Sequence, residues 1–200
     1  MHAELQTGLA HVGAALREPE EFAQRWQSGA ADYSPWVWGG LLGTAIFGTT
    51  TYGMTMGLLG GVPDVLQKGL ICTFAAGTAW AVALPALYIL NSLSGSQLSF
   101  SSTVLAALVT VSWGGLAMVA SIPINWFLLT AIPHSGFALL VNLVVFAGVG
   151  VAMTDVFRRV MRRLDPAREM FPAWWLVLVA AIGSELFFHL GLFQFPAVGH

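Results

Sequence analysis

The chain has 200 residues, of which 56% are hydrophobic and only 9% are charged, and its formal net charge is −2. Ordinary globular domains carry about 25% charged residues, so this composition excludes a soluble domain and is typical of a protein that lies mostly in lipid. The small net charge does not indicate nucleic-acid binding. Cys72 is the only cysteine, so neither an internal disulfide nor a thiolate metal cluster can form.

Residues 1–33 form a charged N-terminal segment that we predict to be cytoplasmic. A proline and two acids at 19–21 are typical of a helix start, because proline fits the first turn and acids favour the positive end of the helix dipole. Phe22 and Trp26 follow, one helical turn apart. The segment predicts a short amphipathic helix on the membrane surface, with a merely tethered tail as the alternative.

The remaining residues, 34–200, carry five apolar stretches long enough to cross a membrane, since a span needs about 20 apolar residues. Short runs rich in glycine, proline and serine separate the first four of them. The predicted fold is all-α: a polytopic membrane protein with a bundle of five transmembrane helices and an N-terminal interfacial helix. The five stretches cover residues 36–59, 65–90, 103–129, 136–157 and 173–193.

Basic residues predict the orientation of this bundle. Arg17 and Arg25 precede the first stretch, and five arginines lie between residues 158 and 168, whereas Lys68 is the one basic residue elsewhere. Five crossings place the N-terminus and the arginine-rich connection on one side, so seven of the eight basic residues share that side. The positive-inside rule assigns it to the cytoplasm. We expect a protein of the bacterial inner (cytoplasmic) membrane with its C-terminus, His200, outside.

Glu185 is the one carboxylate deep inside an apolar stretch, near the middle of the fifth. A charge at the centre of a span costs about 2.5–3.5 kcal/mol, so something must offset it. His189 lies four residues further on, on the same helical face, within reach of a carboxylate–imidazole hydrogen bond. We favour a structural or inter-subunit contact for this pair. A proton or substrate path, or a metal or pigment ligand, are the alternatives.

No metal site and no cofactor are predicted. Glu185 and His189 would need a third and a fourth metal ligand, and their spacing is unlike that of a zinc-binding His-Glu-x-x-His helix. Haem or chlorophyll at His189 is the alternative, and the eight tryptophans would suit a pigment-binding protein. Four of these tryptophans fit the interfacial belt of any membrane protein equally well. They are Trp36, Trp38, Trp174 and Trp175.

Glycines cluster in the first apolar stretch. Gly39 and Gly43 are four residues apart, as are Gly53 and Gly57. Small residues at this spacing form helix faces that a neighbouring helix approaches closely. Such a face is equally consistent with partner binding and with packing inside the bundle.

A group of four arginines comes at the end of the fourth stretch: Arg158, Arg159, Arg162 and Arg163. The group is typical of a topology determinant, with contact to anionic lipid head groups as the functional alternative. The sequence holds neither a Gly-x-Ser-x-Gly motif nor a Walker-type phosphate loop. We therefore predict no catalytic residue and no enzyme.

Two segments resemble the Yip family (Ypt-interacting proteins) and its bacterial relatives. One is the proline-led aromatic segment Arg17-Glu18-Pro19-Glu20-Glu21-Phe22, and the other is the polar loop Leu93-Ser94-Gly95-Ser96-Gln97-Leu98-Ser99-Phe100. The resemblance implies five closely spaced spans behind a cytoplasmic N-terminus, and it implies no catalytic residue. The eukaryotic members act as membrane-embedded adaptors in trafficking, a role that we do not transfer to this chain.

The favoured function is that of a non-catalytic accessory or scaffolding subunit. It would bind other integral membrane proteins and lipids, within a larger complex or as a homo-oligomer. The aromatic content and His189 make a bioenergetic or photosynthetic assembly one candidate host. The alternative function is that of a small transporter or channel component that uses Glu185.

Overall fold

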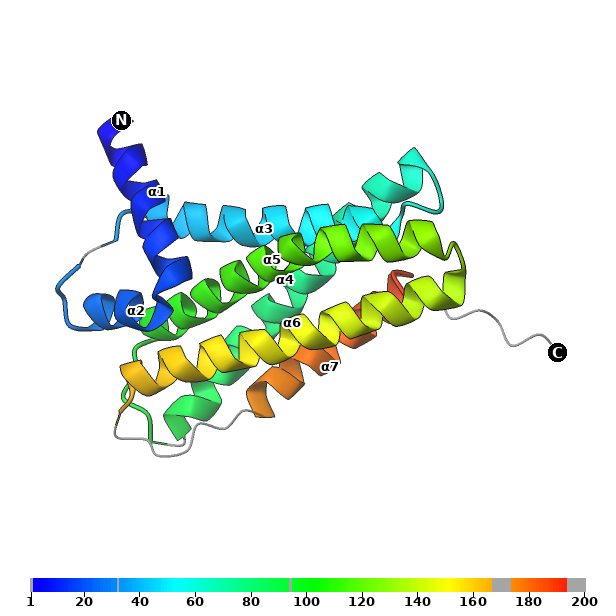
Figure 1. Cartoon of the computed structure of the whole chain (residues 1–200). Coiled ribbons are helices and arrows are strands. Elements are labelled where there is room, and N and C mark those ends of the chain that lie inside the picture. The colour runs from blue at the N-terminus through cyan, green and yellow to red at the C-terminus, as the bar shows by residue number, and fades with distance from the viewer. Residues whose placement is uncertain (1, 32, 94, 167–173, 194–200) are drawn as a thin grey trace.

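The structure, a computed structural model, describes residues 2–31, 33–93, 95–166 and 174–193, and its regular elements there are all helices. The predicted all-α class is therefore confirmed for the described residues. The helices are α1 (His2–Arg17), α2 (Pro19–Gln27), α3 (Pro35–Met56), α4 (Val62–Leu93), α5 (Phe100–Ala131), α6 (Ser135–Leu164) and α7 (Trp174–His189) (Figure 1).

Three of the helices, α4, α5 and α6, are long and apolar enough to cross a membrane. They have 32, 32 and 30 residues, which is about 45–48 Å at 1.5 Å per residue and exceeds the roughly 30 Å of a hydrocarbon core. α3 and α7 occupy the first and fifth predicted stretches with 22 and 16 residues. The fold defines a helical membrane protein, in which length and composition support three of the five predicted spans.

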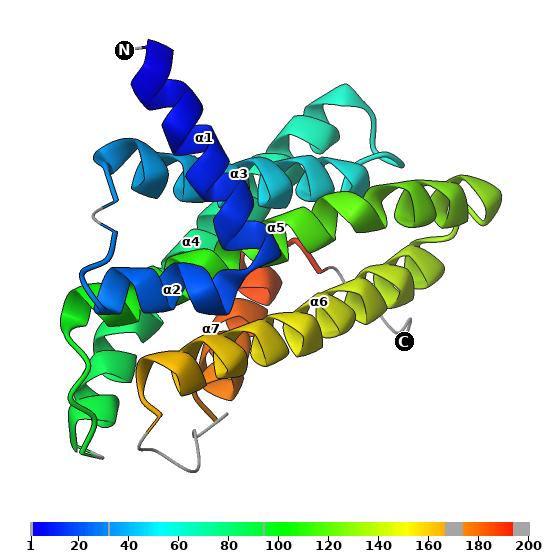
Figure 2. The same ribbon diagram turned by 60° about the vertical axis from the view of Figure 1, so that its left-hand side comes forward.

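α3 packs closely against both α4 and α5. α6 packs on α5, α7 packs on α4, and α6 and α7 meet along a short contact. Successive helices from α3 to α7 alternate in direction, so the α3–α4 and α5–α6 turns lie at one end of the bundle (Figure 1). The opposite end holds α1, α2, residues 95–99 and the C-terminal end of α6, and we call it the α2 end (Figure 2).

The N-terminal segment docks on the α2 end as two helices (Figure 2). α2 begins at Pro19, and its buried side chains Phe22 and Ala23 lie in the core that α2 shares with α5 and α6. α1, a helix that the sequence pattern did not predict, packs against α3, where Val12 lies beside Gly40. The amphipathic helix therefore directs its apolar face toward protein.

Aromatic rings fix this docked segment. Tyr33 stacks on Phe22 with ring centroids 4.0 Å apart and 6° between the planes, and its hydroxyl donates to the Phe22 carbonyl at 2.9 Å. Trp26 meets Trp38 of α3 edge-on at 5.5 Å. Such pairs contribute about 0.5–1.5 kcal/mol each beyond their buried area, so the segment is part of the folded core.

Glycine brings the backbone of α3 close to both of its neighbours. A Cβ added at Gly48 would lie 2.2 Å from the carbonyl oxygen of Gly115 on α5, and one added at Gly53 would lie 2.6 Å from the Cβ of Cys72 on α4. Carbon atoms in contact are normally about 3.5–4.0 Å apart, so no larger residue fits at either position. Ser112 of α5 adds a hydrogen bond to the Leu41 carbonyl of α3 at 2.7 Å.

These contacts predict opposite outcomes for two alanine substitutions in one helix. Gly48→Ala forces α3 away from α5 and should cost about 1–3 kcal/mol, as overpacking does. Gly43→Ala, whose added Cβ meets no atom within 4 Å, should leave stability unchanged or slightly raised, because alanine loses less chain entropy than glycine. Thermal unfolding of both variants in the same detergent measures the difference. Equal melting temperatures would refute the close α3–α5 contact.

Candidate functional site

Glu185 and His189 form a hydrogen-bonded pair on α7. The His189 Nε2 lies 2.9 Å from the Glu185 Oε1, one turn away on the same helix. Both side chains point away from the bundle, since 72% of the Glu185 and 67% of the His189 side chain are exposed. The face of α7 that packs on the bundle instead carries Val179, Gly183 and Phe187.

The pair lies near the C-terminal end of α7, which is shorter than the predicted apolar stretch. His189 is the last residue of the helix, and Gly191, with φ at 71°, ends it in a left-handed turn. The amide of Leu192 donates to the Phe187 carbonyl at 2.9 Å, which is the Schellman pattern of helix termination. Lys68 of α4 donates to the Gly191 carbonyl, so the lone lysine caps this turn.

The surface around the pair is apolar. Val177 and Phe188 are exposed on α7, and Ala181 lies between them on the same side. Ser184 is also exposed, but its hydroxyl donates to the Ala180 carbonyl of its own helix. The Glu185 carboxylate and the His189 imidazole therefore lie in an otherwise apolar, outward-facing surface. Contact of such polar groups with lipid tails costs free energy.

Glu185 and His189 supply two metal ligands, whereas a metal site would need a third and a fourth. Among the described residues, no group of three or more His, Cys, Asp and Glu side chains lies close enough to hold a metal ion. The Nε2 of His189 is already bonded to Glu185, so an axial ligand to haem or chlorophyll would have to use Nδ1 or displace the carboxylate. The pair is best suited to exchanging hydrogen bonds with a polar group of another chain.

The four predicted glycines divide between two environments. Gly53 and Gly57 face α4, where an added Cβ would meet Cys72 and Val65 at 2.6 and 2.5 Å. Gly39 and Gly43 are exposed, and an added Cβ would meet nothing within 4 Å. The inner pair therefore packs the bundle, and the outer pair lies on its surface.

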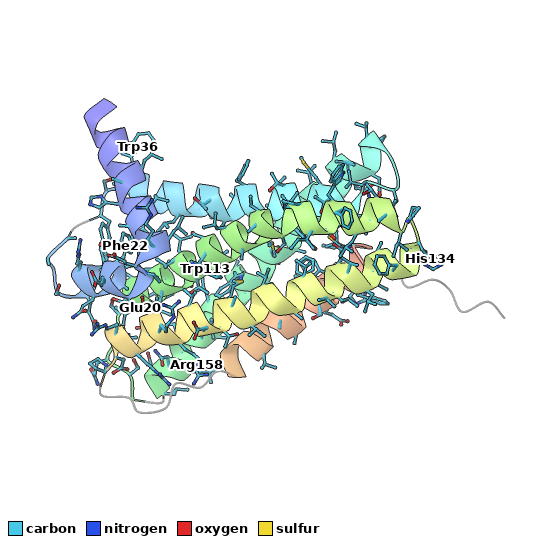
Figure 3. All side chains as sticks on the ribbon, viewed as in Figure 1. Glu20, Phe22, Trp36, Trp113, His134 and Arg158 are labelled. Carbon is cyan, nitrogen blue, oxygen red and sulfur yellow. The ribbon has the colours of Figure 1, made fainter. Side chains whose placement is uncertain are left out.

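The four predicted arginines also fall into two groups, one paired with acids and three exposed. Arg159 pairs with Glu20 of α2 and with Asp155 of its own helix, the latter at 2.9 Å, and so ties α2 to α6. The other three, Arg158, Arg162 and Arg163, are exposed, and no acid among the described residues pairs with them. Figure 3 shows Arg158 at the α2 end, to which Glu20 also belongs.

A buried polar cluster joins α3, α5 and α6 near the turn end of the bundle. The Tyr52 hydroxyl donates to the Asn142 Oδ1 at 2.8 Å, and the Asn125 Nδ2 donates to the Thr55 Oγ1 at 2.7 Å. The Asn125 Oδ1 is buried and has no hydrogen-bond partner among the described residues. We predicted no site here, although single asparagines inside apolar stretches are a signal of such helix contacts.

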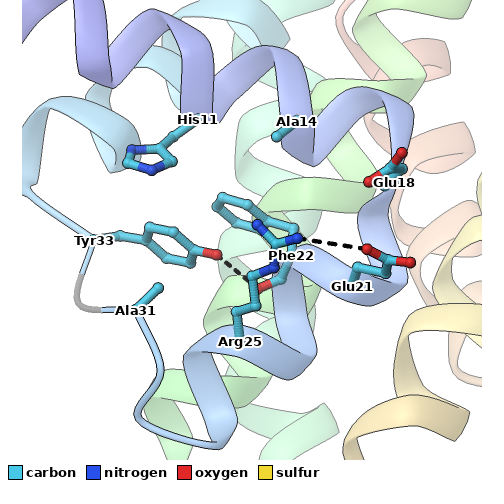
Figure 4. Close-up of a pocket in the computed structure, with 8 residues that line it drawn as sticks. All are labelled: His11, Ala14, Glu18, Glu21, Phe22, Arg25, Ala31 and Tyr33. Atoms are coloured by element: carbon cyan, nitrogen blue, oxygen red, sulfur yellow. Dashed lines mark hydrogen bonds and ion pairs between the residues drawn. The ribbon is translucent and has the colours of Figure 1, made fainter.

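A small cavity lies between α1, α2 and Tyr33. Figure 4 shows its lining, which includes His11, Glu21 and Arg25, the last two joined by an ion pair at 3.6 Å. Burial raises the pKa of Tyr33, and the nearby Arg25 lowers it by a smaller amount. The cavity measures about 40 Å³, whereas pockets for organic ligands measure about 300–1,000 Å³, so it holds water at most.

A shallow groove of about 350 Å³ lies at the same end, between α2 and the start of α5. Its lining is polar but uncharged, so it offers no acid or base. The lining residues are Trp26, Gln27, Gln97, Leu98, Ser99 and Ser102.

Comparison of the chain with protein-family models, with curated proteins and with solved structures found no match.

The polar cluster predicts a measurable loss when one hydroxyl is removed. Tyr52→Phe takes away the donor to Asn142 in a buried site and should lower the free energy of unfolding by about 1 kcal/mol. The control is Tyr88→Phe, a half-buried tyrosine whose ring contacts Phe100 and whose hydroxyl has no partner among the described residues. Unfolding titrations in mixed micelles compare the two variants. The cluster contributes nothing if both unfold like the unmodified chain.

Proposed function

We propose that this protein is a non-catalytic membrane subunit that binds another membrane protein through the exposed face of α7. The observation that carries the proposal is the outward-facing pair of Glu185 and His189 in an apolar surface. Their mutual hydrogen bond uses one carboxylate oxygen and one ring nitrogen, and the other oxygen and nitrogen have no partner within the described ranges. A neighbouring helix with a polar side chain at this level would satisfy both and remove them from lipid.

The direction of Glu185 weighs against a transport path inside one chain. A proton or substrate path runs through a bundle interior or a water-filled cavity, where intramembrane acids normally face. The Glu185 side chain faces the opposite way, so a path that used it would have to run between two chains. We therefore place subunit binding before transport.

We further propose that α3 and α7 cross the membrane together with α4, α5 and α6, and that the α2 end faces the cytoplasm of a bacterial cell. The alternating directions of these helices support five crossings (Figure 1). Six arginines at the α2 end, against Lys68 at the other, support the orientation. They are Arg17, Arg25, Arg158, Arg159, Arg162 and Arg163. Arg168 and the C-terminal His200 lie outside the described residues.

The resemblance to Yip-like proteins remains part of this proposal. A cytoplasmic N-terminus followed by five spans is the layout that the resemblance implies. Ser96, in one of the two resembling segments, donates to the Asp165 carboxylate at 2.8 Å and so links that loop to the end of α6. The host complex, for which a bioenergetic or photosynthetic assembly is one candidate, is the partner to be identified.

Substitutions in α7 should separate subunit binding from transport. Glu185→Leu and His189→Leu remove the polar groups and should reduce the amount of partner that co-purifies with the chain at least fivefold. Glu185→Gln keeps the hydrogen-bonding shape and should retain the partner. Quantitative mass spectrometry after gentle solubilisation measures the ratio of partner to chain.

Ser184→Ala is the matched control, because Ser184 is exposed on the same turn but bonds only to its own helix. Co-purification that is unchanged in both leucine variants would refute the proposed interface. A Glu185→Gln variant that assembles fully yet loses the activity of its complex would favour proton transport.

The orientation has its own test in a Cys72→Ala background. Ser28→Cys, at the exposed end of α2, should resist a membrane-impermeant maleimide added to intact cells, because we place it in the cytoplasm. Leu59→Cys, in the α3–α4 turn, should react. Labelling of the first position and protection of the second would reverse the orientation.

A further inference from the structure

α6 carries a surface stripe that changes from apolar to basic along its length. Leu140, Val144 and Val151 are exposed by 57%, 63% and 73%, and their spacing of four and seven residues places them on one side of the helix. Arg158 and Arg162 continue the same spacing and are also exposed. A lipid whose acyl chain contacts the apolar part of this stripe therefore has its head group beside the two arginines.

The length of the apolar part matches a bilayer. The 20 residues from Ser135 to Thr154 carry no charged side chain and extend about 30 Å, which is the thickness of a hydrocarbon core. Asp155 follows immediately, and the arginines come within the next two turns. Their guanidinium groups are thus at the level of the lipid phosphates at the α2 end.

The described acids nearest this stripe are bonded to groups other than Arg158 and Arg162. Arg159 takes both Glu20 and Asp155, and the Asp165 carboxylate accepts a hydrogen bond from Ser96. Arg158 and Arg162 keep their positive charge without an acid partner among the described residues, and Arg163 lies beside them.

Guanidinium groups suit a phosphate in both charge and shape. Each presents a planar fork of N–H donors that binds two phosphate oxygens, and residues four apart on a helix have Cβ atoms about 5–6 Å apart. Arg158 and Arg162 can therefore converge on one phosphate. In a zwitterionic lipid a cationic group in the head group offsets the phosphate charge and would be repelled by the arginines, so the site should prefer lipids with net negative charge.

We propose that Arg158 and Arg162, with Arg163 beside them, bind the phosphate of an anionic phospholipid whose acyl chain lies along Val151, Val144 and Leu140. The site rests only on the membrane class of the protein and is independent of the proposed α7 interface. The simpler alternative, that these arginines only set the topology, predicts no preference of the folded protein for any head group.

Native mass spectrometry of the full chain in a non-ionic detergent tests the site, with phosphatidylglycerol and phosphatidylcholine of equal chain length as probes. The unmodified chain should bind phosphatidylglycerol at least tenfold more tightly than phosphatidylcholine. Removing both charges in Arg158→Gln/Arg162→Gln should weaken phosphatidylglycerol binding about 25-fold, at about fivefold per arginine, and leave phosphatidylcholine binding unchanged.

The matched control is Arg17→Gln/Arg25→Gln, which removes the same charge at the same end but from α1 and α2, outside the α6 stripe, and it should bind like the unmodified chain. Equal affinity of the unmodified chain for the two lipids overturns the proposal without any variant. An equal loss in the control overturns it as well, since the effect would then come from net charge. Complete competition by millimolar inorganic phosphate would reassign the site to free phosphate.

Discussion

The close contact of α3 with α4 and α5 is the constraint on which the rest of the structure depends. Because Gly48 and Gly53 bring backbones together, α3 can pack closely on two helices and still leave their other faces free for α6 and α7. Lipid tails are as apolar as leucine side chains, so the association of helices relies on packing and hydrogen bonds more than on water exclusion. The Ser112–Leu41 bond and the cluster around Tyr52 supply such hydrogen bonds at two levels of α3.

The two ends of the bundle differ in how they are closed. At the turn end the helices are joined by short connections, and Lys68 caps the end of α7. At the α2 end, α1 and α2 fold onto the helices through stacked aromatic rings and the pairing of Glu20 with Arg159. The N-terminal segment therefore packs as part of the membrane domain. Its Glu20 pairs with Arg159 of α6, whereas Arg158 and Arg162 have no acid partner among the described residues.

The two candidate binding surfaces, on α7 and on α6, share one feature: each exposes polar side chains in or beside an apolar surface. On α7, Glu185 and His189 are bonded to each other but expose polar atoms in an apolar surface, which suits a protein partner. On α6, Arg158 and Arg162 have no acid partner in the described part of the chain and lie where an apolar stripe ends, which suits a lipid head group. α7 runs toward the turn end and α6 runs toward the α2 end (Figure 1). The C-terminal part of α7, with Glu185 and His189, and the C-terminal part of α6, with the arginines, therefore lie at opposite ends of the bundle.

The sequence by itself determined the membrane class, the helical content and the grouping of arginines, because these follow from composition and from the length of the apolar stretches. It also placed Glu185 and His189 one turn apart. Only the tertiary structure decided that this pair faces outward at a helix end and that Gly53 is buried while Gly43 is exposed. It also decided that Arg159 pairs with acids, whereas Arg158 meets none among the residues that the structure describes. The reason is that an apolar helix is hydrophobic on every side, so its periodicity does not tell which side a neighbouring helix covers.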